Sequence, residues 1–177
     1  MCIRDRRNMM YTALGSGHPF MIRYPRGHGE GLPWRGEKFE TLPVGRGRRL
    51  REGADVALLT VGTVGNAAAR AAGRAAAEGV SVAHYDLRFV KPLDEALLDE
   101  VGRKFRRVVT VEDGSLRGGV GEAVAAFFNG RGYDVRVQRL GIGDEWVEHG
   151  TPGQAVVRPV RLRRGGHSAR PARYPRV

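Results

Sequence analysis

The chain has 177 residues, of which 41% are hydrophobic and 28% charged, a composition that favours a soluble globular domain and excludes a disordered chain. No stretch approaches the roughly 18 to 20 uninterrupted apolar residues of a membrane-spanning helix, and the start lacks the apolar core of a signal peptide, so we expect a cytoplasmic protein with no membrane partner. A single cysteine, Cys2, excludes an internal disulfide and a cysteine-based zinc site.

The net charge of +11 would by itself suggest a nucleic-acid partner. Seven arginines and no acidic residue lie in residues 155–177, so residues 1–154 carry a net charge of only +4. This tail also holds three prolines and has no helical or strand periodicity. The charge therefore belongs mostly to one segment, and a nucleic-acid partner is not the expected one. A polybasic arm that binds RNA or anionic lipid is the alternative interpretation of the tail.

The first elements along the chain are too few to make a domain. Residues 8–15 are predicted to close a helix, and residues 18–24 read as a short apolar strand that ends at Pro25 and Gly27. Left alone, such a strand would expose unpaired backbone groups and apolar side chains. Glycine, proline and charged residues then dominate residues 29–53, which predicts a linker along the surface.

A regular alternation of strands and helices begins at Ala54. Small side chains in the alanine-rich stretch favour a helix packed closely on a sheet, and Asp94 is a suitable N-cap for the next helix. The expected strands are residues 55–62, 80–87, 107–113 and 134–141, and the expected helices are residues 66–78, 94–105 and 119–128. This order predicts an α/β fold, with a mostly parallel sheet flanked by helices on both faces.

The strongest chemical pattern is RYPRG, which places Arg23 and Arg26 at the end of the first predicted strand. Pro25 stiffens the turn between them, and Gly27 lets the backbone leave sharply. A guanidinium presents a planar pair of donors that suits two phosphate oxygens, so this pattern is typical of a site for a phosphorylated sugar. The simpler interpretation of the spacing alone is that both arginines form ion pairs at a surface or between domains.

Three motifs together resemble the 1-deoxy-D-xylulose-5-phosphate synthase family, thiamine-diphosphate enzymes of the transketolase superfamily. They are MIRYPRGHGEG at 21–31, YDLRFVKPLDEALL at 85–98 and VTVEDGSLRGGVGEAV at 109–124. The resemblance runs from about residue 8 to about residue 154 and covers the C-terminal part of that family. It implies that residues 1–28 are a remnant of the pyrimidine-binding domain, 29–53 a linker and 54–154 a transketolase C-terminal-like domain.

The resemblance implies a reaction, cofactors and one substrate contact. Enzymes of this family condense pyruvate with glyceraldehyde 3-phosphate, release carbon dioxide, use thiamine diphosphate and Mg²⁺, and act as homodimers in the supply of isoprenoid, thiamine and pyridoxal precursors. The arginine that matches Arg26 binds the phosphate of glyceraldehyde 3-phosphate, and Arg23 is a weaker candidate for the same contact. A transketolase or the β-subunit of a 2-oxoacid dehydrogenase is the alternative, but RYPRG together with DLRFVKPLD favours the synthase.

The cofactor-binding pattern of such enzymes is missing from this sequence. They need a Gly-Asp-Gly motif followed by an asparagine, because Mg²⁺ requires oxygen ligands while it bridges the diphosphate. The nearest match, Glu112-Asp113-Gly114 with Asn129, has the wrong first residue and too short a spacing. We therefore assign no catalytic, cofactor or metal residue to this chain, and we expect the chain alone to be inactive and to bind no cofactor.

Several other patterns are less specific. The glycines of residues 118–121 could hold an anion on free amides of a helix start, or could allow close packing of helix on strand. Glu148-His149-Gly150 matches a structural turn of the family, and the five histidines have no metal-ligand spacing. A further group of charged residues could meet at a domain or subunit junction, or could be solvated: Asp86, Arg88, Lys91 and Asp94.

Neither end of the chain receives a function. The opening MCIRDR resembles translated sequencing-adaptor sequence. After EHGT at 148–151 the family would continue into an amphipathic helix with acidic residues, whereas this chain becomes arginine-rich. We hypothesise that the reading frame is lost near residue 155, and resequencing of the coding DNA would test that.

Overall fold

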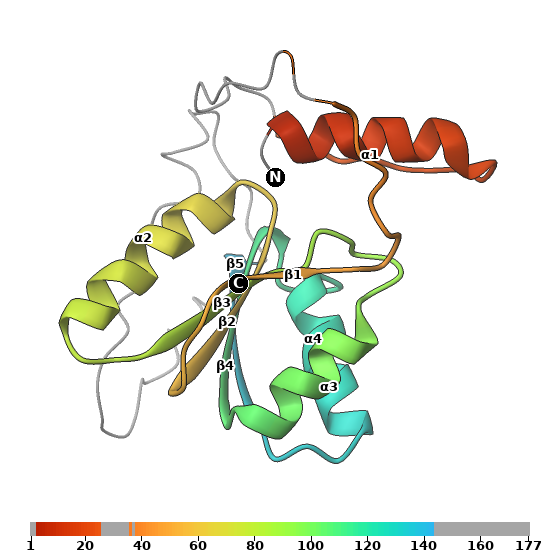
Figure 1. Ribbon diagram of the computed structural model, residues 1–177. Coiled ribbons are helices and arrows are strands. Elements are labelled where there is room, and N and C mark those ends of the chain that lie inside the picture. The colour runs from red at the N-terminus through yellow and green to blue at the C-terminus, as the bar shows by residue number, and fades with distance from the viewer. Residues whose placement is uncertain (1–2, 26–35, 37, 144–177) are drawn as a thin grey trace, which may run out of the picture.

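The strands form one five-stranded sheet in the order β1-β3-β2-β4-β5 (Figure 1). The computed structural model describes residues 3–25, 36 and 38–143. The parallel neighbours are β3 with β2, β2 with β4, and β4 with β5, whereas β1 runs antiparallel to β3 at one edge. The strand bounds are Arg48–Arg51 for β1, Val56–Val61 for β2, Val82–Asp86 for β3, Arg107–Ser115 for β4 and Arg136–Ile142 for β5.

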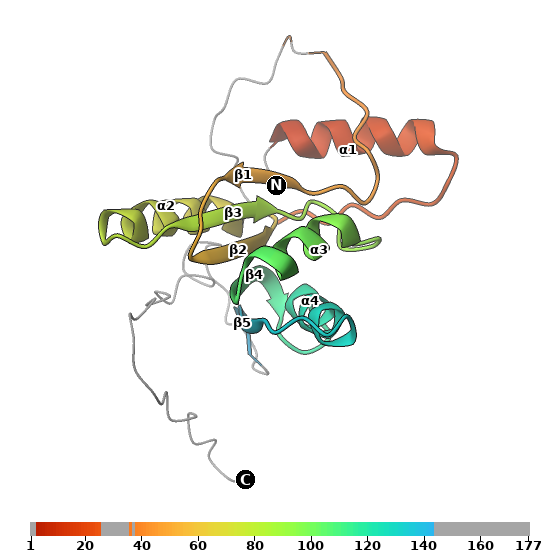
Figure 2. The ribbon, with the colours of Figure 1, turned by 60° about the horizontal axis from the view of Figure 1, so that its bottom comes forward.

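Helices cover both faces of this sheet, as Figures 1 and 2 show. Helix α2 (Val64–Ala77) packs on one face through small side chains that include Ala68 and Ala72. Helices α3 (Glu95–Lys104) and α4 (Val120–Gly130) pack on the other face. Side chains of β2 alternate between the two faces, so that Leu58 joins the α2 core and Leu59 joins the α3 and α4 core.

The predicted α/β fold with a mostly parallel, doubly covered sheet is confirmed. From β2 to β5, the observed elements differ from the predicted ones by no more than two residues at their starts, and β4 runs two residues beyond the expected end, to Ser115. Asp94 caps α3 as expected, since its side chain accepts a hydrogen bond from the Leu97 amide.

Two predictions about the N-terminal third are wrong. Residues 18–24 form no strand, because no described strand runs beside them and side chains rather than backbone hydrogen bonds hold them in place. The expected linker ends in a strand, β1, which an arginine-rich sequence gave no reason to predict. The predicted closing helix is confirmed, since α1 (Ile3–Ser16) contains residues 8–15 and ends one residue later. None of the helices among the described residues is long and apolar enough to cross a membrane.

Candidate functional site

Helix α1 lies at the end of the sheet where the parallel strands finish (Figure 1). An apolar cluster joins it to that end, with Met9 from α1, Leu42 from the segment before β1, and Phe89 from the loop after β3. All three are less than 7% exposed. Phe20 and Ile22 pack against the cluster from the segment that leads toward RYPRG. We call these five residues the junction cluster. The segment that leads to RYPRG is therefore brought to the carboxyl edge of the sheet, where open α/β sheets bind ligands.

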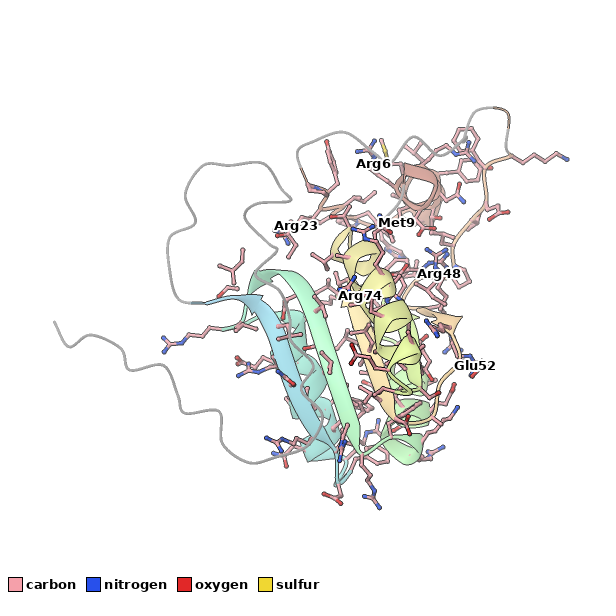
Figure 3. The ribbon with its side chains drawn as sticks, turned by 90° about the vertical axis from the view of Figure 1, so that its left-hand side faces the viewer. Arg6, Met9, Arg23, Arg48, Glu52 and Arg74 are labelled. Atoms are coloured by element: carbon pink, nitrogen blue, oxygen red, sulfur yellow. The ribbon has the colours of Figure 1, made fainter. Side chains whose placement is uncertain are left out.

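Charged side chains extend this junction and form what we call the junction network: Asp5, Arg48, Asp86 and Arg88. The Arg48 guanidinium lies 2.5 Å from an Asp5 oxygen and 3.0 Å from an Asp86 oxygen. Arg88 contacts the other Asp5 oxygen at 3.3 Å. Figure 3 shows Arg48 on the side of the sheet that faces α1. The Asp5 side chain is only 3% exposed, whereas Arg48 is 37% exposed, so the carboxylate is shielded from water more than its arginine partner.

The structure decides between the two interpretations of the charged group around β3. Solvated charge was the safer assumption, and it is wrong for Asp86, Arg88 and Asp94. Asp94 is buried, and besides capping α3 it accepts hydrogen bonds from Arg46 and from the Gly47 amide, both at 3.0 Å. Lys91 is exposed. Asp86 and Arg88 thus meet in the junction network, whereas Asp94 has other partners and Lys91 joins neither set.

Sequence reasoning missed Asp5. It lies in the opening stretch that was set aside, yet its carboxylate joins two arginines from distant parts of the chain. The sequence around Asp5 did not indicate this role, because only the fold brings Arg48 and Arg88 together around one carboxylate.

Of the two candidate arginines, the structure describes only Arg23. The Nη1 atom of Arg23 donates a hydrogen bond of 2.6 Å to the carbonyl oxygen of Asp113, just beyond the middle of β4. Figure 3 shows Arg23 at the end of the sheet beside the turn that follows β4. Arg26 lies outside the described residues, as do Glu148, His149 and the basic tail. The role of Arg26 therefore stays a prediction.

Glu112 occupies the helix start that could have held an anion. One carboxylate oxygen accepts from the Val120 amide at 2.8 Å and the other from the Gly121 amide at 2.9 Å. A side chain at Gly119 would place its Cβ 2.2 Å from the Ser115 carbonyl oxygen, so only glycine fits there. The packing interpretation of these glycines is therefore correct, and their amides already have an anionic partner.

The nearest match to a cofactor motif does not fit Mg²⁺. Glu112 holds the first turn of α4, whereas Asn129 lies in its last turn. Within the described ranges, no three His, Cys, Asp or Glu side chains gather closely enough to hold a metal ion. The residues described here do not fit the magnesium diphosphate group, and we derive no step through it.

His84 is a buried histidine at the centre of the sheet. It is 1% exposed, and its Nε2 lies 2.9 Å from the Thr60 hydroxyl. Burial lowers the pKa of His84, since charge is costly in the core, and Arg51 lowers it further while Asp86 opposes the shift. His84 is thus a neutral packing residue in the middle of β3.

Comparisons with known proteins all identify relatives of the transketolase type. Residues 45–157 match the family described as the C-terminal domain of transketolase. A 1-deoxy-D-xylulose-5-phosphate synthase from Bacteroides fragilis is 52% identical over 152 residues, which are 85% of this chain and 23% of that protein. The synthase from Symbiobacterium thermophilum is 44% identical over 154 residues, 87% of this chain and 24% of its own length. The chain thus spans about a quarter of the curated relatives it matches.

A solved structure gives the same indication. It is described as a split-gene transketolase in an inactive β4 tetramer, is 35% identical in sequence, and superposes with a TM-score of 0.57. The match covers 64% of this chain and 38% of that one. The sheet with its flanking helices is therefore shared with a transketolase-type protein.

Proposed function

The chain belongs to the transketolase C-terminal domain family, and on that premise we propose that it is the C-terminal part of a 1-deoxy-D-xylulose-5-phosphate synthase. The relatives that carry this name match the chain over most of its length. RYPRG and DLRFVKPLD, in this order, favour the synthase over a transketolase or a 2-oxoacid dehydrogenase β-subunit. The complete enzyme would be a cytoplasmic homodimer that condenses pyruvate with glyceraldehyde 3-phosphate and releases carbon dioxide.

In the complete enzyme, thiamine diphosphate with Mg²⁺ would supply the activation of pyruvate. The residues of this chain would have a different task, the binding of the phosphate group of glyceraldehyde 3-phosphate by Arg26. A guanidinium can hold two phosphate oxygens at once, which fixes the orientation of the sugar as well as its charge. Arg23 stays the weaker candidate, because its Nη1 donates to the Asp113 carbonyl.

The single observation that carries this proposal is the location of the RYPRG segment. Phe20 and Ile22 pack into the junction cluster and Arg23 contacts Asp113, so residues 20–25, which lead to Arg26, cross the carboxyl edge of the parallel sheet. Pro25 is described, and Arg26 follows it directly in the sequence. This edge is the usual ligand-binding edge of an α/β sheet.

The exposed face of α1 supports the idea that residues 1–28 belong to a larger domain. Met10, Tyr11 and Leu14 on this helix are 55%, 46% and 88% exposed. A helix of a folded domain usually buries such a stripe against a neighbour. The rest of a pyrimidine-binding domain, which would also carry the acidic group for the cofactor ring, would cover these side chains.

Product formation by a chimera tests the proposed function. In this chimera, the stretch of the chain that matches the Bacteroides fragilis synthase replaces its counterpart in that enzyme. We expect the purified chimera to form 1-deoxy-D-xylulose 5-phosphate from pyruvate and glyceraldehyde 3-phosphate, and the 177-residue chain alone to form none. A folded, dimeric chimera that binds thiamine diphosphate but forms no product would contradict the proposal.

The runner-up functions have their own tests. A chimera that accepts ketose donors and aldose phosphates instead of pyruvate would favour transketolase. A nucleic-acid-binding module would show salt-dependent RNA binding that survives deletion of residues 155–177. No described residue favours either function over the synthase.

A further inference from the structure

Residues 20–24, which lead to Pro25 and Arg26, are held by contacts on two sides. On one side, the Phe20 ring meets the Phe89 ring edge-on, with centroids 6.4 Å apart, and Ile22 packs against the same junction cluster. Phe20 and Ile22 are two positions apart, as expected when an extended segment turns alternate side chains to one surface. The segment is therefore extended and apolar on the side that faces the cluster, although it belongs to no sheet.

Polar contacts hold the remaining positions. The Arg23 guanidinium donates to the Asp113 carbonyl oxygen at 2.6 Å. The guanidinium carbon of Arg6, in the first half of α1, lies 4.9 Å from the centre of the Tyr24 ring, a cation–π contact. The segment is thus held by α1, by the loop after β3 and by β4.

The Asp113 carbonyl lies between residues that are hydrogen-bonded to α4 and to β5. Its neighbour Glu112 places both carboxylate oxygens on the first amides of α4. Further along the turn, the Leu116 amide donates to the Ile142 carbonyl of β5 at 2.8 Å. Gly119 and Gly121 allow the start of α4 to pack closely on β4, since a Cβ on either would lie within 2.5 Å of a neighbouring oxygen.

We propose that Arg23 is a positioning residue, which clamps residues 20–25 to the second half of β4, and that Glu112 supports this contact by fixing the strand beside the Asp113 carbonyl. This inference rests on the proposed function, in which the phosphate of glyceraldehyde 3-phosphate is bound just beyond Pro25. In this role Arg23 binds the main chain, with its Nη1 donating to the Asp113 carbonyl, and it reaches the phosphate only through the segment that it holds. A small displacement of a binding group lowers substrate affinity even when the group itself is intact.

Backbone nitrogen relaxation in the full 177-residue chain tests the clamp without any assumption about the enzyme. No described backbone hydrogen bond involves the amides of residues 20–24, so their order parameters, rather than their exchange rates, report how firmly the segment is held. Arg23→Ala should lower these order parameters from about 0.85, typical of rigid backbone, to below about 0.6, because the segment loses its hydrogen bond to Asp113. Arg23→Lys keeps a donor for the carbonyl and should restore most of the order. The matched control is Arg106→Ala, because Arg106 also donates to a main-chain carbonyl, that of Asp134, at the opposite end of the sheet. Unchanged order parameters in Arg23→Ala would overturn the proposal.

Kinetics of the synthase chimera test the link to the substrate. Arg23→Ala and Glu112→Gln should each raise the KM for glyceraldehyde 3-phosphate by about three- to tenfold and leave the KM for pyruvate unchanged. The double variant should be no worse than the more affected single variant, because both changes loosen one contact. Additive effects, or equal effects on both substrates, would overturn the proposal.

The outcomes separate this inference from the proposed function. If Glu112→Gln lowers the thermal midpoint of the chain, Arg23→Ala and Arg23→Lys alone decide the kinetic test. An effect of Arg26→Ala with none of Arg23→Ala would leave the proposed function intact and remove the positioning role. If Arg26→Ala changes neither KM, the proposed phosphate contact fails and the positioning role fails with it, while the relaxation data still report the clamp.

Discussion

The sheet domain, residues 56–142, and the N-terminal region, residues 3–25, are stabilised in different ways. The sheet domain has an apolar core on each face, with Leu98, Val101 and Phe128 at 1% exposure or less. The N-terminal region has one small cluster, a charged network, and apolar side chains that remain exposed on α1. The sheet domain can therefore be explained by its own sequence, whereas the N-terminal region depends on what it contacts.

This difference bears on function. The segment proposed to carry the phosphate contact belongs to the dependent region, and its position is set by side chains of the sheet domain. We infer that the sheet domain serves the active site of the complete enzyme as a rigid support. The predictions below separate the two regions, in order of decreasing effect.

The largest effect is expected for Phe128→Ala, which would leave a cavity between α4 and the sheet and cost about 3 to 5 kcal/mol. Met9→Ala removes a side chain of comparable burial from the junction cluster. It should loosen α1 and residues 20–24 while the sheet domain keeps its unfolding midpoint. Urea unfolding followed by circular dichroism, with hydrogen exchange for each region, measures both. Global unfolding of the Met9 variant would show that the regions are not separable.

A smaller effect is expected for Asp5→Ala, because it leaves Arg48 and Arg88 without the carboxylate they share. We expect a loss of about 1 to 3 kcal/mol, since Arg48 is partly exposed and water offsets part of the lost interaction. The loss should appear as faster exchange in α1. Asp134→Ala is the matched control, as its ion pair with Arg106 is exposed on both sides and contributes little.

Gly121→Ala should destabilise the sheet domain by about 1 to 3 kcal/mol, because the new Cβ would lie 2.5 Å from the Thr110 hydroxyl and 3.1 Å from Glu112. Gly130→Ala, in the same helix but with open space around it, should be neutral or slightly stabilising. Thermal unfolding of both variants makes the comparison. Equal midpoints would show that α4 does not need its close approach to β4.

The smallest effect concerns pH. Burial lowers the pKa of His84, so the folded state resists protonation that the unfolded state accepts. Stability should be full above the ordinary histidine pKa of about 6.5 and fall as the pH decreases below it. His84→Gln should flatten this dependence between pH 7 and pH 5. The unfolding free energy measured across this range tests the assignment. A slope that persists unchanged in His84→Gln would contradict it.

The helices and strands of the sheet domain could be predicted well, because the residues within each element specify it. Apolar runs, an alanine-rich helix and the Asp94 cap each specify their own element. Residues 18–24 show the limit, since an apolar extended segment has the same pattern whether backbone or side chains hold it. Glu112 could not be assigned either, because its partners lie eight and nine residues later and meet it only after the turn forms.

The central claim is that the segment held against the sheet domain supplies the phosphate contact of the synthase. Steady-state kinetics of Arg26→Ala in the synthase chimera test it most directly. We predict that the KM for glyceraldehyde 3-phosphate rises on the order of tenfold to a hundredfold, as loss of charge-assisted hydrogen bonds requires, while the KM for pyruvate is unchanged. An equal change for both substrates, or no change for glyceraldehyde 3-phosphate, would contradict the claim.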